Sequence, residues 1–308
     1  MPRRLGYGDT GWADFGKLLQ PSFRTAALPL EVRMPSPLLQ MRRSNLGKNH
    51  LQTLRWLKRE GWKIGFRPDA YLLSHPTYGT IPTPIELQLR SHPSSDLDTL
   101  QQIFVEMQYL PAVQAMLQHS PSCHNPLIID GGANAGLCTV FLARLFPNHR
   151  IIAVEPFSEN VEVMRRNFER ASITGVEIFE GALWGHAARL QLNRAHGDGR
   201  EWAASVIELG SGWIEGATVE QLVNRYFPGS PIDLLKLDIE GAEFSVLNDP
   251  ATERFIVSNV RVLTMEVHPG FGDIPALLER YSAHFALEKL GEDYVGYNRQ
   301  PVVERGAQ

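Results

Sequence analysis

The sequence predicts an α/β protein in which strands alternate with helices to form a doubly wound, mostly parallel sheet. Three observations support this prediction. Between residues 127 and 283, apolar segments of strand length alternate with segments of helical periodicity. The first strand runs into a glycine-rich turn, Gly131-Gly132-Ala133-Asn134-Ala135-Gly136. Acidic residues stand where strands end, at the edge of a parallel sheet where ligands bind.

The chain before residue 95 is organised differently from the part that follows it. Residues 1–43 are rich in proline and glycine, which favours irregular structure. A helix is predicted over residues 45–60, with short strands and turns over 62–94. We therefore divide the chain into an N-terminal extension, a main domain and a C-terminal tail, at residues 1–94, 95–300 and 301–308. The extension is a candidate substrate lid or oligomerisation arm.

The main domain begins with a predicted helix from Ser95 or Asp96 to about Tyr109, and Pro111 lies beyond its end. Strands are predicted near residues 127–130, 150–155, 176–180, 232–238 and 260–267. Helices are predicted near residues 137–146, 158–171, 218–227, 241–248 and 273–283, the third with a capping box of Thr218 and Gln221. A final strand pair, 285–289 and 294–298, is expected to add antiparallel strands at one side of the sheet.

The composition is that of a soluble globular protein, with 43% hydrophobic and 21% charged residues. No apolar run approaches the roughly 20 residues that span a bilayer, and the N-terminus lacks the apolar segment of a secretory signal. A cytoplasmic protein without a membrane partner is therefore expected. The net charge of −4 gives no electrostatic reason to expect nucleic acid as a partner.

The two cysteines, Cys123 and Cys138, are too few for a disulfide framework or a cysteine-built zinc site. Cys138 falls in the first turn of the helix after the glycine turn. A small buried side chain is expected there rather than a reactive thiol.

The glycine turn points to a nucleotide-like cofactor. It places bare backbone N–H groups and a helix N-terminus beside the carboxylate of Asp130. A pyrophosphate-binding turn needs the pattern G-x-G-x-x-G, whereas Ala133 occupies the place of the second glycine. Asp130 would also repel a pyrophosphate, but it could pair with the ammonium and sulfonium groups of S-adenosyl-L-methionine. We therefore interpret the turn as a methyl-donor site.

The next two strand ends fit a bound nucleoside. Glu155 stands 25 residues after Asp130, where an acid accepts hydrogen bonds from ribose hydroxyls. This feature fits a dinucleotide and S-adenosyl-L-methionine equally well, and a helix-capping or surface role is the structural alternative. Gly181 and Ala182 follow the third strand, where small residues would let an adenine ring lie flat or would simply make a tight turn.

Ionisable residues end the fourth and fifth strands. Asp238 would sit at the crevice of the sheet, whereas Glu240 and Glu243 stand at a helix start that tolerates acids for dipole reasons alone. Glu266 and His268 are two residues apart, so in a strand they point to the same face. His268 is a candidate general base or a structural partner of Glu266. It could also join Asp238 and Glu266 as metal ligands, although no local ligand motif supports a metal.

Together these segments resemble the FkbM family of S-adenosylmethionine-dependent methyltransferases. The resemblance covers about residues 90–300. It is carried by Ser95-Asp96-Leu97 with Tyr109, Ile129-Asp130-Gly131-Gly132-Ala133-Asn134-Ala135-Gly136, Val154-Glu155-Pro156 with Asn160, Gly181-Ala182-Leu183, Lys236-Leu237-Asp238-Ile239-Glu240-Gly241-Ala242-Glu243, and Glu266-Val267-His268-Pro269. It implies a Rossmann-like class I methyltransferase fold and methyl transfer, usually to a hydroxyl oxygen of a natural product or sugar.

The resemblance also implies roles for individual residues. The glycine turn would hold the methionine end of the cofactor, Glu155 the ribose, and Gly181 and Ala182 the adenine. The implied cofactor-binding residues are Asp130, Gly131, Gly132, Asn134, Gly136, Glu155, Pro156, Gly181, Ala182 and Asp238. On the acceptor side it matches Asp238, Glu243 and His268 without assigning the base. We hypothesise that His268 takes the proton, assisted by Asp238 or Glu266.

Three alternative functions fit parts of the same pattern. An NAD-dependent oxidoreductase has the same architecture, but the glycine spacing and Asp130 count against it. A nucleic-acid methyltransferase is disfavoured by the charge and by the absence of an Asn/Asp-Pro-Pro-Tyr/Phe motif after the fourth strand. A non-catalytic S-adenosylmethionine-binding module fits less well, because acids are present on both the donor and the acceptor side. The expected partner is a small-molecule hydroxyl acceptor, and a homo-oligomer is compatible with the sequence.

The segment 193–216 has no role that the resemblance supplies. It contains glycines together with Trp202 and Trp213, and it lies between the third and fourth strands. We leave open whether it forms a lid or an ordinary surface excursion.

Overall fold

The computed structural model describes residues 50–76, 84–91, 93–120, 126–193, 205–300 and 302. The predictions for residues 1–49, Cys123, Trp202 and most of the C-terminal tail therefore lie outside the described residues. Within the described ranges, no helix combines the length and the apolar character needed to cross a membrane.

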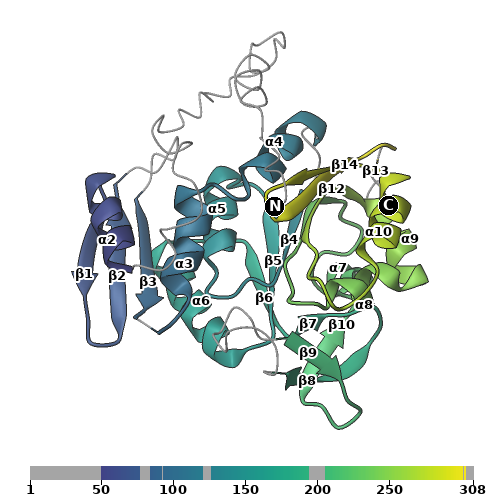
Figure 1. Ribbon diagram of the computed structural model, residues 1–308, viewed down its shortest axis with the longest axis horizontal. Helices are drawn as coiled ribbons and strands as arrows, with labels where there is room; N and C mark the ends of the chain where they lie inside the picture. Colours follow the sequence, from purple (N-terminus) through teal and green to yellow (C-terminus); the bar gives the residue numbers. More distant parts are fainter. Residues whose placement is uncertain are drawn as a thin grey trace, which may run out of the picture.

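A seven-stranded sheet forms the centre of the molecule (Figure 1). From one edge to the other its strands are β13 (Phe285–Leu290), β14 (Asp293–Asn298), β12 (Val260–Glu266), β11 (Ile232–Leu237), β4 (Leu127–Gly131), β5 (Arg150–Glu155) and β6 (Val176–Glu180). Every pairing from β12 to β6 is parallel. The strand order reverses between β11 and β4, and open α/β sheets bind ligands at such a reversal.

Both faces of this sheet are covered by helices, so its central strands are buried and mostly apolar. All residues of β4 and β11 are buried. One core cluster joins the sheet to α5 (Leu137–Leu145) and α6 (Ser158–Arg170). A second cluster lies against α7 (Val219–Tyr226), α8 (Glu243–Asn248), α9 (Pro250–Asn259) and α10 (Ile274–Ser282). The predicted doubly wound, mostly parallel Rossmann-like sheet is confirmed, as is the capping box of Thr218 and Gln221.

The C-terminal strand pair adds to one side of the sheet, as predicted, but β14 lies inside it. β14 pairs antiparallel with both β12 and β13. The edge strand β13 therefore runs parallel to β12 without touching it. A sheet in which only the last strand runs against the others is the class I methyltransferase arrangement that the resemblance implied.

The structure contains two helices that the sequence did not predict, and each has a proline in its first turn. The predicted helix of residues 95–109 is α3 (Asp96–Leu100), which continues into the π-helix η2 (Gln101–Val105). Pro111 lies in the first turn of a further helix, α4 (Leu110–His119), and Pro250 likewise opens α9. Proline suits the first turn because the N–H that it lacks has no partner inside the helix.

The part of the N-terminal extension that the structure describes packs onto the main domain (Figure 1). It consists of α2 (His50–Arg59) and an antiparallel sheet of β1 (Lys63–Phe66), β2 (Ala70–His75) and β3 (Ile85–Arg90). Leu57 and Leu89 belong to the same buried cluster as Phe104 and Phe141. The extension therefore shares a hydrophobic core with the domain that follows it.

A second small sheet forms between β6 and α7. Its strands, in spatial order, are β7 (Ala182–Leu183), β10 (Ile214–Ala217), β8 (Ala188–Asn193) and β9 (Ser205–Glu208). The segment that the sequence left open as a lid or a surface excursion thus contributes β9 and β10 to a sheet. Trp213, just before β10, is exposed.

Candidate functional site

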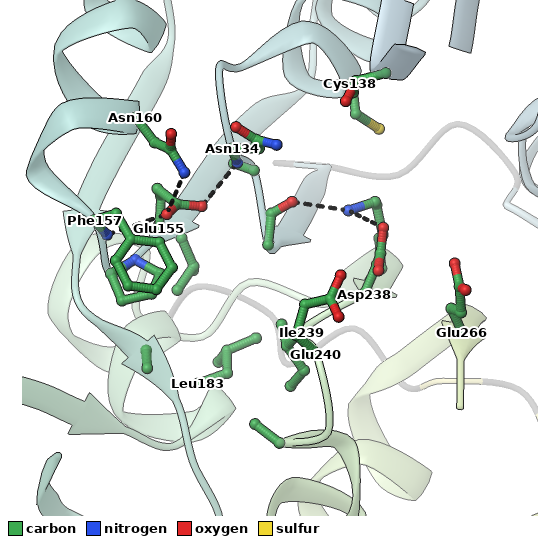
Figure 2. Close-up of a pocket in the computed structure, with 18 of the residues that line it drawn as sticks. Asn134, Cys138, Glu155, Phe157, Asn160, Leu183, Asp238, Ile239, Glu240 and Glu266 are labelled. Carbon is green, nitrogen blue, oxygen red and sulfur yellow. Dashed lines mark hydrogen bonds and ion pairs between the residues drawn. The ribbon is translucent and has the colours of Figure 1, made fainter. Parts of the chain in front are cut away.

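A cavity opens where β4, β5, β11 and β12 end, beside the reversal of strand order. In Figure 2, Glu155, Asn160 and Phe157 gather at one end of the cavity, Glu266 lies at the other, and Glu240 lies between them. Of the residues predicted for the site, the cavity is lined by Gly132, Asn134, Glu155, Pro156, Ala182, Asp238 and Glu266. The predicted residues that lie outside its lining are Asp130, Gly131, Gly136, Gly181, Glu243 and His268.

The glycines of the turn set how closely the backbone packs. A Cβ on Gly132 would lie 1.8 Å from the carbonyl oxygen of Asp238, and the φ of Gly132 is +75°. A Cβ on Gly136 would lie 2.6 Å from Cγ of Met164, on α6. Asn134, with a φ of 48°, is the third left-handed residue of this turn. The turn thus fits tightly against the end of β11 and the side of α6.

Glu155 is the central residue at the first end of the cavity, the end where Asn160 and Phe157 also lie. Its carboxylate accepts hydrogen bonds from the backbone N–H of Asn134 (2.8 Å), the backbone N–H of Phe157 (3.1 Å) and Nδ2 of Asn160 (3.0 Å). Burial raises the pKa of Glu155 to about 7, against the lowering effect of these hydrogen bonds. A carboxylate held by three donors and facing a cavity is a suitable acceptor for the hydroxyls of a nucleoside.

A buried ion pair lies beneath the glycine turn. Nζ of Lys236 is 3.1 Å from Oδ1 of Asp130, and it donates to the carbonyl oxygens of Gly131 (3.0 Å) and Gly132 (3.2 Å). Asp130 also accepts a hydrogen bond from Thr139. Burial alone lowers the pKa of Lys236, but the negative charges around it, first Asp130 and then Asp238, together outweigh burial and raise that pKa. The structure thus pairs Asp130 with a lysine of its own chain and leaves it outside the cavity lining.

The second end of the cavity is acidic. It is lined by Asp238, Glu240, Glu266 and Glu292. Oδ2 of Asp238 accepts a hydrogen bond from the hydroxyl of Tyr109 (3.2 Å) and lies 3.9 Å from Nζ of Lys236. Burial, together with the charge of Asp238, raises the pKa of Glu266 to about 8. Glu266 is therefore a stronger base than an ordinary carboxylate.

His268 is held by carboxylates on both sides of its ring. Nδ1 lies 3.1 Å from Oε1 of Glu243, and Nε2 lies 3.4 Å from Oε2 of Glu240 and 3.8 Å from Oε1 of Glu266. Burial alone lowers the pKa of His268, but the hydrogen bond to Glu243 and the nearby charges outweigh it and raise the pKa to about 9. At neutral pH the ring already holds a proton, which suits a structural partner better than a general base.

Glu243 holds the turn that presents Asp238 and Glu240. Its fully buried carboxylate accepts hydrogen bonds from the backbone N–H groups of Ile239 (2.9 Å) and Gly241 (2.9 Å), besides its contact with His268. Asp238, Glu240 and His268 also offer ligand atoms that all lie within 4.8 Å of one another. Among the residues that the structure describes, this set, rather than Asp238, Glu266 and His268, has the spacing to hold a metal ion.

Sequence reasoning assigned no role to Lys236, Tyr109 or Asn160, which also line the cavity. Lys236 carried a signal, because a lysine inside an otherwise apolar parallel strand is rarely buried without a partner. The register of β4 and β11 places it opposite Asp130. Cys138 lines the cavity too, and burial raises the pKa of its thiol, consistent with the expected small buried side chain.

Comparisons with known proteins identify the family of this chain. The family described as "Methyltransferase FkbM domain" matches residues 130–287. Methyltransferase sdnD of Sordaria araneosa is 30% identical over 190 residues, which cover 50% of this chain and 72% of that protein. Methyltransferase 1 of Beauveria bassiana (strain ARSEF 2860) is 25% identical over 191 residues, covering 55% of this chain and 77% of that protein. The structure of a Streptococcus mutans protein in complex with SAH aligns with 61% of this chain and 96% of that protein, with 13% identity and a TM-score of only 0.37.

Proposed function

The chain belongs to the FkbM methyltransferase domain family, and from this premise we propose that it is an O-methyltransferase. The proposed reaction moves a methyl group from S-adenosyl-L-methionine to a hydroxyl of a small molecule, such as a natural product or sugar. The observation that carries the proposal is one cavity that joins a nucleoside-like end at Glu155 to an acidic end at Glu266. Donor and acceptor can therefore meet inside it.

The residues of the cavity fit this cofactor. Glu155 can accept hydrogen bonds from its ribose, and the side chains of Leu183 and Ile239 offer an apolar wall to its base (Figure 2). Asp238 and Glu240 suit its cationic end. When bound, S-adenosyl-L-methionine supplies an electrophilic methyl group on a positively charged sulfur. The chain's own residues align the acceptor with that methyl and remove the hydroxyl proton, for which Glu266 is the best-placed base.

The same acids disfavour the alternative of an NAD-dependent oxidoreductase. A dinucleotide would bring its pyrophosphate next to the carboxylates of Asp238 and Glu240, which repel it. Nucleic acid is disfavoured as an acceptor for the same reason, because its phosphates would meet Glu266 and Glu292.

Binding of the donor product is expected to depend on pH through Glu155. With a pKa of about 7, Glu155 gains a proton as the pH falls below 7 and loses acceptor strength toward ribose hydroxyls. Calorimetric titration with S-adenosylhomocysteine should show an affinity that falls by up to about tenfold per pH unit between pH 7 and 5. Glu155→Gln should bind weakly at every pH, whereas Glu159→Gln, at an exposed acid nearby, should match the wild type. Binding of NAD in place of S-adenosylhomocysteine would overturn the donor assignment.

The charge of an acceptor is expected to decide how fast it is methylated. Three acceptors with one sugar skeleton, namely a neutral methyl glycoside, its amino analogue and its 6-phosphate, should be compared by mass spectrometry of the methylated product. The acids at the second end predict transfer to the first two, with the phosphate at least about tenfold slower. Nuclear magnetic resonance of the product should place the new methyl on oxygen. Methylation on nitrogen alone, or a preference for the phosphate, would contradict the proposed acceptor class.

A further inference from the structure

Arg90, the last residue of β3, reaches from the N-terminal extension to the nucleoside end of the cavity. Nη2 lies 2.6 Å from Oδ1 of Asp96, and Nε lies 3.1 Å from Oδ2 of the same carboxylate. On its other side the guanidinium donates to Oδ1 of Asn160 (2.8 Å) and, at 3.4 Å, to Oδ1 of Asn134. Asp96 is fully buried at the start of α3. The ion pair thus fixes the guanidinium in one orientation.

Both asparagines that Arg90 contacts are donors to Glu155. Asn160 donates from Nδ2 and Asn134 from its backbone N–H. A guanidinium can only donate, so its contact with Oδ1 of Asn160 decides which way that amide points. The amide nitrogen is left facing Glu155. Arg90 therefore orients the side chain of one of the three donors to the carboxylate, Asn160, and contacts the side chain of a second, Asn134.

We propose that Arg90 is a positioning residue of the methyl-donor site, through which the N-terminal extension builds the nucleoside end of the cavity. The inference rests on the proposed function, because it takes Glu155 as the acceptor for the ribose of the donor. It gives the extension a role other than a lid or an oligomerisation arm. The described extension is then part of the donor site, since its last strand ends on the arginine that orients the Asn160 amide toward Glu155.

Arg90 acts on Glu155 through its charge as well as through its hydrogen bonds to the asparagines. The ionisable groups around Glu155 are Arg90, with Asp96 behind it, and Glu180, which lies opposite on β6 and accepts a hydrogen bond from Ser158. Arg90 lowers the pKa of Glu155 against the larger effect of burial. Loss of its charge should therefore move the pH midpoint of donor binding upward, which a purely structural role would not do.

The test is calorimetric titration with S-adenosylhomocysteine between pH 6 and 9. Arg90→Met should bind about tenfold more weakly at pH 7, with a midpoint raised by about half a pH unit or more. Arg90→Lys keeps the charge but cannot contact Asp96 and Asn160 together, so its midpoint should stay near the wild type while affinity recovers only in part. Arg170→Met is the matched control, since Arg170 contacts Gln88 of the same strand from the outer side of α6.

The variants also separate this inference from the proposed function. Arg90→Met leaves Asp96 buried without its partner, so the double variant Arg90→Met/Asp96→Asn is measured beside it, with thermal melting of each. Wild-type affinity and midpoint in both variants would overturn the inference. The inference would also be overturned if the affinity fell in proportion to the melting temperature while the pH midpoint of binding stayed unchanged. Wild-type binding by Glu155→Gln would instead refute the proposed nucleoside site itself.

Discussion

Gly132→Ala is expected to abolish binding of S-adenosylhomocysteine and to lower the free energy of unfolding by about 3 kcal/mol or more. The new Cβ would lie 1.8 Å from the carbonyl oxygen of Asp238. That oxygen belongs to the backbone, so the clash can be relieved only by moving the chain at the end of β11. The movement would displace Asp238 and would disturb the contacts of Lys236 with the turn.

Gly229→Ala is the matched control for this prediction. Gly229 has nearly the same backbone conformation, with a φ of +78°, but a Cβ there would meet nothing within 4 Å. Its substitution should cost only the strain of a left-handed alanine, about 1–2 kcal/mol. Denaturant unfolding measures both costs, and calorimetry measures the binding. Equal losses in the two variants would show that backbone conformation, and not contact with β11, requires glycine at residue 132.

Glu266→Gln is expected to reduce turnover by about a hundredfold or more while leaving binding of S-adenosylhomocysteine intact. Glu266 lines the cavity, and with a pKa of about 8 it is a better proton acceptor than an ordinary carboxylate. Glu266 is ionised above that pKa and neutral below it. The rate of the wild type should therefore rise between pH 7 and 9, and the rise should disappear in the variant.

His268→Gln distinguishes this assignment from the base that the sequence suggested. His268 holds its proton up to about pH 9 and faces Glu243 and Glu240. The variant should keep more activity than Glu266→Gln. The pH at which its rate rises should be higher than in the wild type, because the positive charge that lowers the pKa of Glu266 is gone. Full turnover by Glu266→Gln beside an inactive His268→Gln would restore histidine as the base. Assays with and without a chelator test whether a metal held by Asp238, Glu240 and His268 contributes.

Much of the sheet could be predicted because its signals are local. Each signal lies within a run of consecutive residues. This holds for the apolar segments that form β4, β5, β11 and β12 and for the turn residues that follow them. Helix α4 was missed because a proline near a helix boundary can mark either the end of one helix or the first turn of the next, and Pro111 was assigned to the end of the helix before it. Which of the two applies depends on what the following residues pack against. The small sheet of β7 to β10 was missed because β7, β9 and β10 are only two to four residues long, too short to show a periodic pattern.

The site was predictable only where a residue acts at the end of its own strand. Glu155, Asp238 and Glu266 were found in this way. Asp130 was assigned to the ligand because its partner Lys236 is 106 residues further along the chain, on a strand whose register the sequence does not reveal. The high pKa of His268 likewise depends on Glu243, which is 25 residues before it in the chain. Arg90 acts across the interface between the extension and α6, for which no local pattern exists.

The place of β14 inside the sheet has a consequence for biosynthesis. β14 follows the other strands of the central sheet in the chain, yet it pairs with β12, so one edge of β12 lacks a partner until residues 293–298 have left the ribosome. The register of this pair sets Asp293 opposite Glu266. The Glu266 end of the cavity is therefore finished after the Glu155 end, whose strands are made more than a hundred residues earlier. In the nascent chain the end of the cavity proposed for the donor can therefore form before the end proposed for the acceptor, and the edge of β12 is unpaired in the interval.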